Sequence, residues 1–596
     1  MRFWPAIFFN APSALTESLL RYSLVWLGIL GSAYCFMTGR HLNLPLVTDM
    51  VSPKAAARLN AFNTILALLF GLVLSYSGFH AISDNARTIV PLLGVSLGSI
   101  QSVLLISGIL TVLSQGVQLL AAVRSGALTL KSLLGIVVTM LAVSVFWLVF
   151  RKTAVYENLV FDHLEIFSLV VLFVAFFGFL FLGTAIAAGL AFAGIITLSL
   201  QLDFGSLFTT VGENIFSSLD NFGFLALPFF VLAGAIMNQG GIAQRLIDLA
   251  MLLGRRIAGN LWQSNILANM LFGCLSGSGI AAATAIGSMI APAAREKDYD
   301  MPFTTAVNAA SAPCGMLIPP SGPFILYSLI TGGSASIIAM FLAGYLPGMI
   351  MGGAVMLVAW LYAKRRGYSV DRSPYRFSEV AIVFWRALPS LSLVVVVIGG
   401  ILGGVFTAVE GAGVAALYSF LLAVVYRDLT MAKLIRAAGE TVVTSGAILF
   451  LIACSGLMSW SMTFASIPDT IGTLLMSVSE NKYIVLLLIN ISLLVVGVFM
   501  DMTPAMLIFT PIFYPVVTEL GIDPVHFGVV LIYNLCMGVV TPPVGTVLFV
   551  SCSITGEKIT KVVKPLLPIF FLQFAGLLLV TYLPAISLTI PRLFGL

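Results

Sequence analysis

Charged residues are scarce in this chain of 596 residues. Asp, Glu, Lys and Arg make up 9% of it, against roughly 25% in a soluble domain, while hydrophobic residues make up 60%. This balance excludes a soluble globular protein. The net charge of +5 is small and scattered, which indicates that nucleic acid is not a partner. At roughly 20 residues per span, the apolar residues could supply at most about 18 membrane helices.

Several motifs of pumps and enzymes are also missing. The chain has no G-x-x-x-x-G-K-[ST] phosphate loop, no H-E-x-x-H zinc motif and no G-x-S-x-G nucleophile motif. The sequence therefore predicts that the protein is not an enzyme and that ATP is not its direct energy source. Its six cysteines stand singly in apolar runs, without the spacing of a zinc site or a disulfide framework, so we interpret them as packed small hydrophobes.

Long apolar runs are what the chain does have, and they predict an all-α polytopic membrane protein. A β-barrel would need short alternating segments instead. Residues 1–121 form a small module with about three spans, and the run Ser132 to Phe150 lies in a connecting segment, 122–160. A much longer module, 161–596, follows and extends to the C-terminus.

Two clusters of basic residues predict the orientation of the long module. The first is Lys364, Arg365 and Arg366 with Arg372 and Arg376, and the second is Arg427 with Lys433 and Arg436. Two apolar runs separate the clusters, so both fall on one side if each run crosses the membrane once. We place both in the cytoplasm because short cytoplasmic loops retain Lys and Arg.

The long module contains an internal repeat. Gly315 to Gly322 and Gly538 to Gly545 both match G-x-x-x-P-P-x-G, 223 residues apart. A polar break precedes each copy: LSGSG at 275–279 before the first, and MDMTP at 500–504 before the second. We interpret this as a duplication, with repeats at about 223–375 and 445–596.

The interruptions point to chemistry inside the membrane. Two adjacent prolines remove two amide donors and end the helix, so backbone carbonyls are left unpaired. In hydrocarbon such groups are tolerated only inside protein or beside a cavity, where they can coordinate a cation. The polar breaks are typical of re-entrant hairpins. Two hairpins facing two broken helices predict a secondary transporter, whereas a single proline motif could be a simple helix kink.

Asp501 is the most informative single residue, because a carboxylate within a membrane segment costs at least about 2.5–3.5 kcal/mol. It could bind substrate hydroxyls, stabilise a cation or cap the following half-helix. Ser278 and Thr503 are nearby hydroxyls in the two hairpins. Glu410 could be functional too, although an acidic residue at a helix N-terminus is ordinary. The histidines lie at the edges of apolar runs, where interfacial packing is the expected role: His41, His80, His163 and His526.

These motifs together resemble the tripartite ATP-independent periplasmic (TRAP) transporters, and specifically a fusion of their small and large membrane subunits. The resemblance covers nearly the whole chain. Its large-subunit part rests on an ordered set of segments: Leu225 to Gly234, the LSGSG break, Gly315 to Gly322, Gly404 to Glu410, Met500 to Pro504 and the second Pro-Pro copy. Its small-subunit part rests on Glu17, Arg21-Tyr22, Val25-Trp26, Gly31 and Gly39-x-His41.

The resemblance implies a multi-pass protein of the bacterial inner membrane that imports an organic acid with sodium, by an elevator movement of the two repeats. A periplasmic solute-binding protein would deliver the substrate, and membrane lipids would surround the helices. Substrate contacts would come from Ser278, Asp501 and Thr503. Two sodium ions would be bound, one by Gly273, Ser276, Gly315, Ile318 and Pro320, the other by Gly404, Thr407, Gly538, Thr541 and Val544.

The sequence departs from the family pattern near its N-terminus. Only Met1 to Thr16 precedes the small-subunit motif, which suggests a truncated first helix or a start site assigned too late.

Two other functions compete with sodium-coupled import. The first competing function is a proton-driven or autonomous anion carrier with the same core, in which Asp501 titrates. The second is a membrane scaffold or sensor without transport. Dependence of uptake on sodium and on the binding protein separates these hypotheses.

Overall fold

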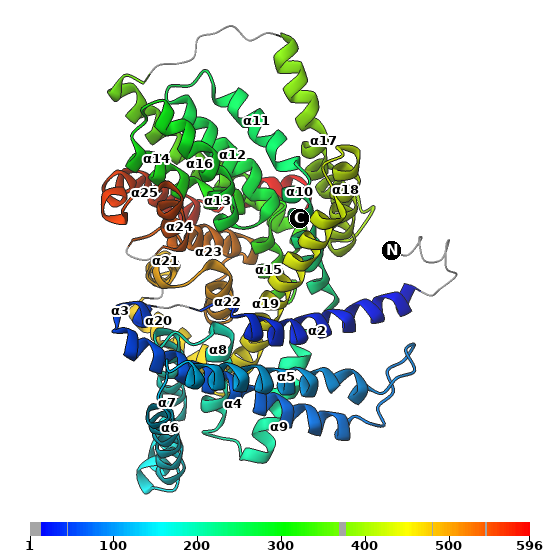
Figure 1. The fold of residues 1–596 in the computed structure, drawn as a ribbon, viewed down its shortest axis with the longest axis vertical. Helices are drawn as coiled ribbons and strands as arrows, with labels where there is room; N and C mark the ends of the chain where they lie inside the picture. Colours follow the sequence, from blue (N-terminus) through cyan, green and yellow to red (C-terminus); the bar gives the residue numbers. More distant parts are fainter. Residues whose placement is uncertain (1–12, 44–45, 369–376, 480, 543–544) are drawn as a thin grey trace. The chain divides into compact units, whose positions relative to one another are not determined.

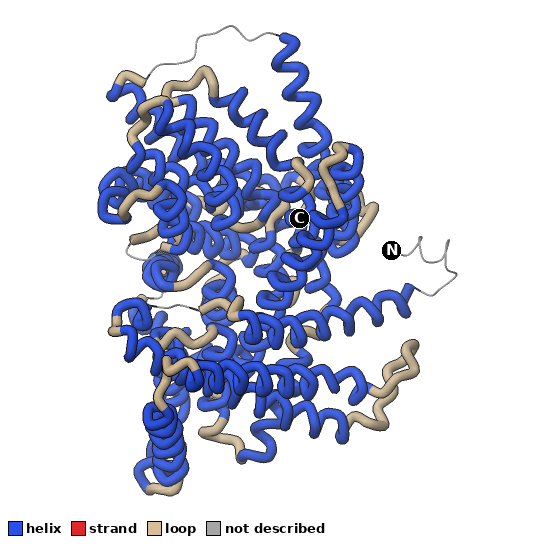
Figure 2. Tube along the Cα trace, viewed as in Figure 1, coloured by secondary structure: helices blue, strands red, loops and turns tan. Residues whose placement is uncertain are grey.

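The structure, a computed structural model, describes residues 13–43, 46–368, 377–479, 481–542 and 545–596. Within these ranges the chain is helical, with two isolated β-bridges and no strand (Figure 2). Among the described residues, twelve helices are long and apolar enough to cross a membrane, and one further bent pair raises this to thirteen if it is a single span. The prediction of an all-α polytopic membrane protein is confirmed. All six cysteines are buried and free, as predicted.

The chain divides into two compact units, each described here by itself. The first comprises Met1–Phe222 and Val442–Leu474, and the second Gly223–Thr441 and Leu475–Leu596. The helices of the first unit are α2 (Ser13–Thr38), α3 (Leu46–Met50), α4 (Pro53–Asp84), α5 (Leu97–Arg124), α6 (Leu130–Phe150), α7 (Ala154–Phe181), α8 (Ile186–Leu198) and α9 (Phe204–Ser217). Figure 1 labels them along the chain.

The second unit holds most of the long module. Its elements are η1 (Phe222–Leu225), α10 (Ala226–Gln239), α11 (Ile242–Gly254), α12 (Asn260–Ser276), α13 (Gly279–Glu296), α14 (Met301–Ser311), η2 (Ala312–Leu317), α15 (Gly322–Ile330), α16 (Ile337–Arg366), α17 (Phe377–Leu402), α18 (Ala408–Val425), α21 (Lys482–Phe499), α22 (Met502–Glu519), α23 (Pro524–Gly538), α24 (Thr546–Thr555), α25 (Ile559–Tyr582) and α26 (Ala585–Leu593). Two helices pass from one unit to the other, α19 (Met431–Phe464) and α20 (Ile467–Val478).

Local sequence signals set the helix boundaries in the first unit. Helix α4 begins at Pro53, where proline's missing amide costs nothing, and α5 begins after Ser96, whose hydroxyl accepts from the Ser99 amide. The run Ser132 to Phe150 forms α6, and nothing in that helix is buried. The run from Ile166 to Leu200 is not one helix, because Gly183 adopts φ +79° and the chain turns between α7 and α8.

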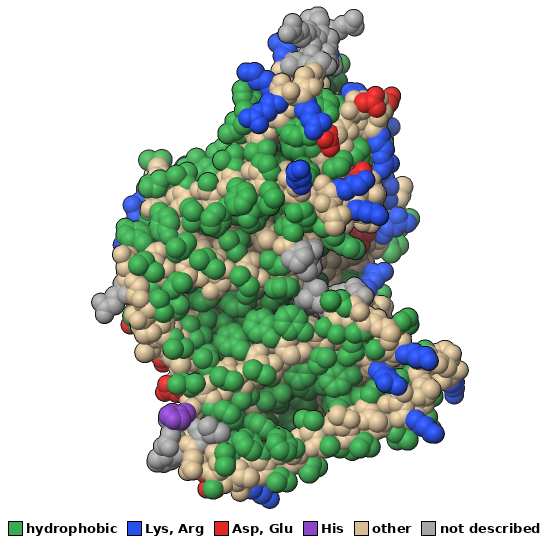
Figure 3. All heavy atoms as spheres, turned by 90° about the vertical axis from the view of Figure 1, so that its left-hand side faces the viewer, with side chains coloured by type: hydrophobic (Ala, Val, Ile, Leu, Met, Phe, Trp, Pro, Cys, Tyr) green, Lys and Arg blue, Asp and Glu red, His purple; other side chains and the backbone are tan. Residues whose placement is uncertain are grey.

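Helices α17 and α18 support the predicted orientation of the basic clusters. Each contains one candidate span, Val380–Leu402 and Ala408–Val425. The basic end of α16, Lys364–Arg366, and Arg427 after α18 therefore lie at the same end of this helix pair, the end that the positive-inside rule assigns to the cytoplasm. Figure 3 shows that hydrophobic side chains cover much of the surface in view, as expected of a protein surrounded by lipid.

Candidate functional site

Four helices of the second unit are interrupted where the sequence predicted. In the first repeat, α12 and α13 are separated by Gly277-Ser278, and η2 and α15 by residues 318–321. The bent pair Met301–Leu317 and Gly322–Ile330 turns by 51°. In the second repeat, α21 and α22 are separated by Met500-Asp501, and α23 and α24 by residues 539–545, of which 543 and 544 lie outside the described residues.

The first hairpin tip is a sharp turn lined with serine hydroxyls. Gly277 adopts φ +61°, a left-handed conformation that favours glycine, and its amide donates to the Gly273 carbonyl at 2.9 Å. Ser278 then caps α13, accepting from the Ala281 amide at 3.3 Å. Ser276 Oγ lies 3.5 Å from the Ser278 amide. The tip therefore exposes two hydroxyl groups next to a helix N-terminus.

The break after Gly315 leaves carbonyl groups without donors. The Ile318 amide donates to the Gly315 carbonyl at 3.0 Å, and the Ser321 hydroxyl donates to the Met316 carbonyl at 2.7 Å. In the described part of the chain, no backbone amide donates to the carbonyl oxygens of Ile318, Pro319 or Pro320 outside regular helix bonds. Such oxygens, buried in a membrane protein, are suitable ligands for a hard cation.

The structure brings the residues of the first predicted sodium site close together. A Cβ added to Gly273 would lie 2.8 Å from the Gly315 Cα, and one added to Gly277 would lie 3.4 Å from the Gly322 amide nitrogen. The hairpin tip and the broken segment therefore lie next to each other at these two points. Ser276, Ile318 and Pro320 lie within these two segments.

The second predicted sodium site draws its residues from two separate segments. Gly538 and Thr541 lie at the end of α23, where the Thr541 amide donates to the Gly538 carbonyl at 2.9 Å. Gly404 and Thr407 lie in the α17–α18 loop, and among the described residues no hydrogen bond joins them to Gly538 or Thr541. Val544 lies outside the described residues.

Glu410 and Thr407 form a capping box at the start of α18. The Thr407 hydroxyl accepts from the Glu410 amide at 3.3 Å, and the Glu410 carboxylate accepts from the Thr407 amide at 2.8 Å. This pattern stabilises a helix N-terminus. Of the two roles considered for Glu410, the geometry supports that of an ordinary acidic residue at a helix start.

Asp501 stands directly before α22 and is half-buried. Although it occupies the N-cap position, its side chain makes no capping hydrogen bond. Its carboxylate lies beside the backbone amide of Met502, the first residue of α22, and beside the hydroxyl of Thr546, the first residue of α24. Thr503 follows in the first turn of α22. The absence of the capping bond disfavours one of the three roles considered for Asp501 and leaves substrate binding and cation binding open.

Thr546 is a candidate site residue that the motif search did not select. It directly follows Gly545, the last glycine of the second G-x-x-x-P-P-x-G copy, and this position was the only signal available in the sequence. Thr546 matters because α24 begins there, facing the second hairpin. Thr546 can be identified only from the residues that surround Asp501 in the folded structure.

The N-termini of four half-helices converge around these breaks. Gly277 lies against the start of α15, Asp501 lies beside the start of α24, and a Cβ added to Gly279 in α13 would lie 3.3 Å from Val547 of α24. The residues before α15, α22 and α24 make no side-chain capping bond. The partial positive charges of these N-termini suit an organic anion, and the Val547 amide of α24 already donates to the Val539 carbonyl at 3.1 Å.

Polar contacts across the two repeats support this arrangement. The Asn308 amide group in α14 donates to the Ala283 carbonyl at 3.0 Å and to the Ser551 hydroxyl of α24 at 3.2 Å. The Arg295 guanidinium at the end of α13 donates to the Thr555 carbonyl at the end of α24. Helices α13 and α24, one from each repeat, therefore pack as a pair beside the site (Figure 1).

Comparison with known families settles the class of protein. The model of the tripartite ATP-independent periplasmic transporter, DctM component, matches residues 173–586, and that of the DctQ component matches residues 6–125. The chain belongs to the TRAP transporter family. It carries both membrane components in one polypeptide, as the resemblance implied, and it is a multi-pass permease of the bacterial inner membrane rather than an enzyme.

Three relatives of this TRAP permease illustrate the range of the family. It is 48% identical over 434 residues to the uncharacterized protein YgiK of Salmonella typhimurium, covering 73% of this chain and 99% of that protein. It is 36% identical to the isethionate TRAP transporter permease protein DctMQ of Oleidesulfovibrio alaskensis, covering 72% and 66%. It is 35% identical to the sialic acid TRAP transporter large permease protein SiaM of Vibrio cholerae, covering 70% and 97%.

Proposed function

We propose that this TRAP permease imports an organic acid, coupled to sodium, after receiving it from a periplasmic solute-binding protein. The observation that carries the proposal is the convergence of half-helix N-termini, three of which have no side-chain cap. An anionic group can satisfy their amides without a dedicated arginine. Isethionate and sialic acid, in the names of two relatives, are both organic anions.

Asp501 and the nearby hydroxyls would select among such anions. A carboxylate beside helix N-termini leaves part of the site negatively charged, so the substrate's own acidic group is expected at the other termini. Asp501, Thr503 and Ser278 would then accept from or donate to the substrate's hydroxyl groups. This division of roles favours a hydroxylated organic acid over a purely apolar one.

Sodium would travel as a second cargo bound to backbone carbonyls. The first proposed site contains Gly273, Ser276, Gly315, Ile318 and Pro320, which lie in two adjacent segments, and its unpaired carbonyls support this assignment. The second proposed site consists of Gly538 and Thr541 at and just after the end of α23, with Gly404, Thr407 and Val544 as its other members. A cation near each break would offset the charge of the anion and make binding of the two cargoes cooperative.

An elevator movement is the proposed mechanism of release. The two repeats, tied by Asn308–Ser551 and Arg295–Thr555, would move as one body and carry the site from one side of the membrane to the other. A rigid transport body needs such contacts between its halves, since they keep the site intact while its surroundings change.

The deciding experiment is uptake into proteoliposomes that contain the permease. Candidate organic acids are presented with the binding protein encoded nearest the gene, with and without an inward sodium gradient at fixed pH. Uptake that requires both would support the proposal and name the substrate. Uptake that needs neither sodium nor the binding protein would favour the proton-driven or autonomous carrier. No uptake of any candidate under all conditions would favour a scaffold or sensor.

A further inference from the structure

Two short helices follow a corner of the same unusual geometry, one in each repeat. Helix α11 follows Gly241, which adopts φ +69°, and α20 follows Ser466, which adopts φ +51°. The two corners are 225 residues apart, close to the 223-residue spacing of the Pro-Pro motifs. Left-handed backbone is unusual for serine, so its presence at the equivalent point of the second repeat indicates that the corner itself is needed there.

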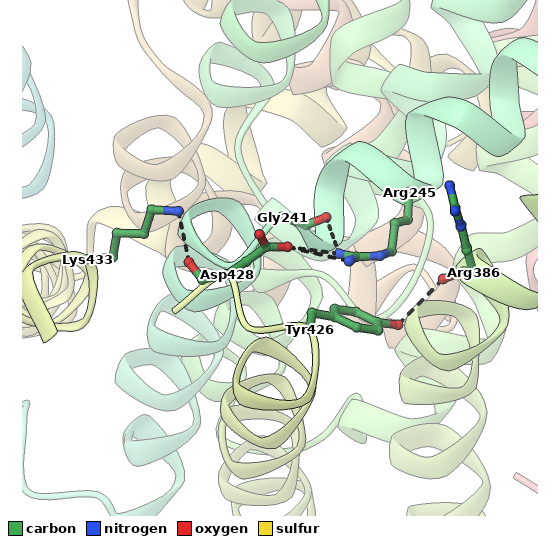
Figure 4. Close-up of polar contacts among 6 residues, drawn as sticks. All are labelled: Gly241, Arg245, Arg386, Tyr426, Asp428 and Lys433. Atoms are coloured by element: carbon green, nitrogen blue, oxygen red, sulfur yellow. Dashed lines mark hydrogen bonds and ion pairs between the residues drawn. The ribbon is translucent and has the colours of Figure 1, made fainter. Parts of the chain in front are cut away.

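The first corner is held by an arginine one turn further along α11 (Figure 4). Arg245 Nη1 donates to the Gly241 carbonyl at 2.8 Å, and both terminal nitrogens lie 3.4 Å from Asp428 Oδ2. The guanidinium carbon is 3.5 Å from the centroid of the Tyr426 ring. Arg245 therefore joins its own corner to the α18–α19 turn through a hydrogen bond, an ion pair and a cation–π contact.

Gly241 leaves the space that this contact needs. A Cβ added there would lie 2.6 Å from Asp428 Oδ2, closer than side-chain atoms pack. The turn that carries Asp428 is itself supported, because Lys433 Nζ donates to the Asp428 carbonyl at 2.8 Å. Gly241 and Asp428 therefore pack closely against each other within the second unit.

At the second corner, a hydroxyl group takes the place of the guanidinium and makes weaker contacts. Thr470 occupies the position in α20 that Arg245 occupies in α11, four residues after the corner. Its hydroxyl lies 3.1 Å from the Ser466 carbonyl and 3.3 Å from Glu165 Oε2 of α7, all within the first unit. A hydroxyl has one hydrogen and can donate to only one of these acceptors at a time.

Both corners lie near points where the chain passes between the compact units. The passage at residues 222–223 comes shortly before α10 and the Gly241 corner, and the passage at residues 474–475 lies inside α20 itself. The third passage, at residues 441–442, lies inside α19, so the corners accompany two of the three passages. Short segments at the ends of helices are where the backbone rotations of such movements occur.

We propose that Arg245 and Thr470 are positioning residues that latch the two corners, and that the Arg245 latch makes the first corner slower to turn than the second. The planar, permanently charged guanidinium satisfies three partners at once, whereas the Thr470 hydroxyl satisfies one. The role of the latches in transport rests on the proposed elevator function. Their effect on the corners does not, and it is measured separately below.

The first test measures amide hydrogen exchange in the full-length protein in nanodiscs. Arg245→Gln should raise exchange in α11 by about two- to fivefold, the range for a partly exposed ion pair, and leave α20 unchanged. Thr470→Val should raise exchange in α20 alone, and by less. Matched controls are Arg436→Gln, outside the latch, and Thr473→Val, whose hydroxyl bonds only its own helix. Unchanged exchange at both corners, or equal changes in the controls, would overturn the latches.

The second test measures uptake kinetics of the same variants in proteoliposomes. Arg245→Gln should raise kcat by about two- to fivefold with KM and the melting temperature unchanged, because a positioning residue changes the rate of movement and not the site. Asp428→Asn should raise kcat by a similar factor, and the double variant Arg245→Gln with Asp428→Asn should raise kcat little further. Faster exchange with unchanged kcat would overturn the role in transport while keeping the latch. If the wild-type protein shows no uptake, the proposed function is refuted. The hydrogen-exchange measurements would still test whether Arg245 and Thr470 hold the corners.

Discussion

Gly497 lies directly against Gly538, so closely that a Cβ added to Gly497 would sit 2.7 Å from the Gly538 Cα. The pair joins α21 to α23 in the second repeat. Gly273 and Gly315 make the same contact in the first repeat, at 2.8 Å. The duplicated spacing in the sequence therefore reflects a duplicated helix contact, in which small residues let two backbones meet beside a break.

A methyl group at this contact should destabilise the protein. We expect Gly497→Ala to cost about 1–3 kcal/mol, because neither backbone can move away easily, and to lower the melting temperature in detergent. Gly353→Ala in α16 is the control, since a Cβ there meets nothing within 4 Å. Equal stability of the two variants would contradict the contact.

Removal of the Asp501 carboxylate should abolish or strongly reduce uptake. Asp501→Asn and Asp501→Ala should be expressed and folded like the wild type, because the carboxylate makes no capping bond that would be lost. Uptake into proteoliposomes is the measurement, with Glu519→Gln at the far end of α22 as the control. Near-normal transport by Asp501→Ala would refute a role for this carboxylate.

A glycine in place of Ser466 should stabilise the protein by up to about 1 kcal/mol, because it removes the cost of left-handed backbone at a residue with a Cβ. The same substitution at Ser459, inside α19, should have the opposite sign and cost about 0.5 kcal/mol. Thermal unfolding of both variants tests the pair. A destabilising Ser466→Gly would show that the serine side chain is needed at the corner.

Replacement of Asn308 by the isosteric Leu should destabilise the second unit by at least about 2 kcal/mol. It removes the donor that the Ala283 carbonyl and the buried Ser551 hydroxyl share, and one of the acceptors of the Asn269 amide group. Thr284→Val is the control, because Thr284 is exposed and bonds only within α13. Chemical unfolding compares the two. A Leu variant as stable as the control would mean that the contact between repeats contributes little.

His41 should make stability depend on pH. Burial lowers the pKa of its imidazole from 6.5, and Nδ1 is buried without a partner in the described structure. The unfolded chain therefore binds a proton that the folded protein resists, so stability should fall as pH drops below about 6.5. The difference in melting temperature between the wild type and His41→Gln, followed from pH 7.5 to pH 5, isolates this group. A difference independent of pH would contradict it.

Much of the candidate site could be predicted because its signals are local. Pro319-Pro320 and Gly277 interrupt helices through their own covalent geometry, whatever surrounds them, and the second copy of the motif marks the second break. The apolar runs likewise predict the helices α17 and α18, and the basic clusters that flank them predict which end of the pair faces the cytoplasm. The same reasoning could not select Thr546, Asn308 or Arg295, because each is an ordinary residue whose role depends on a partner about 45 to 260 residues away.

The sequence by itself determined that this protein is an all-helical membrane protein and predicted a transporter with a duplicated core, because composition, proline chemistry and repeat spacing are properties of the chain alone. Only the tertiary structure decided which breaks meet, that Asp501 lies beside Thr546, and that Arg245 and Thr470 hold equivalent corners. The physical reason is that apolar periodicity specifies that a helix is buried in lipid or protein but not which helix it packs against. That choice depends on side-chain fit and hydrogen bonds between distant segments.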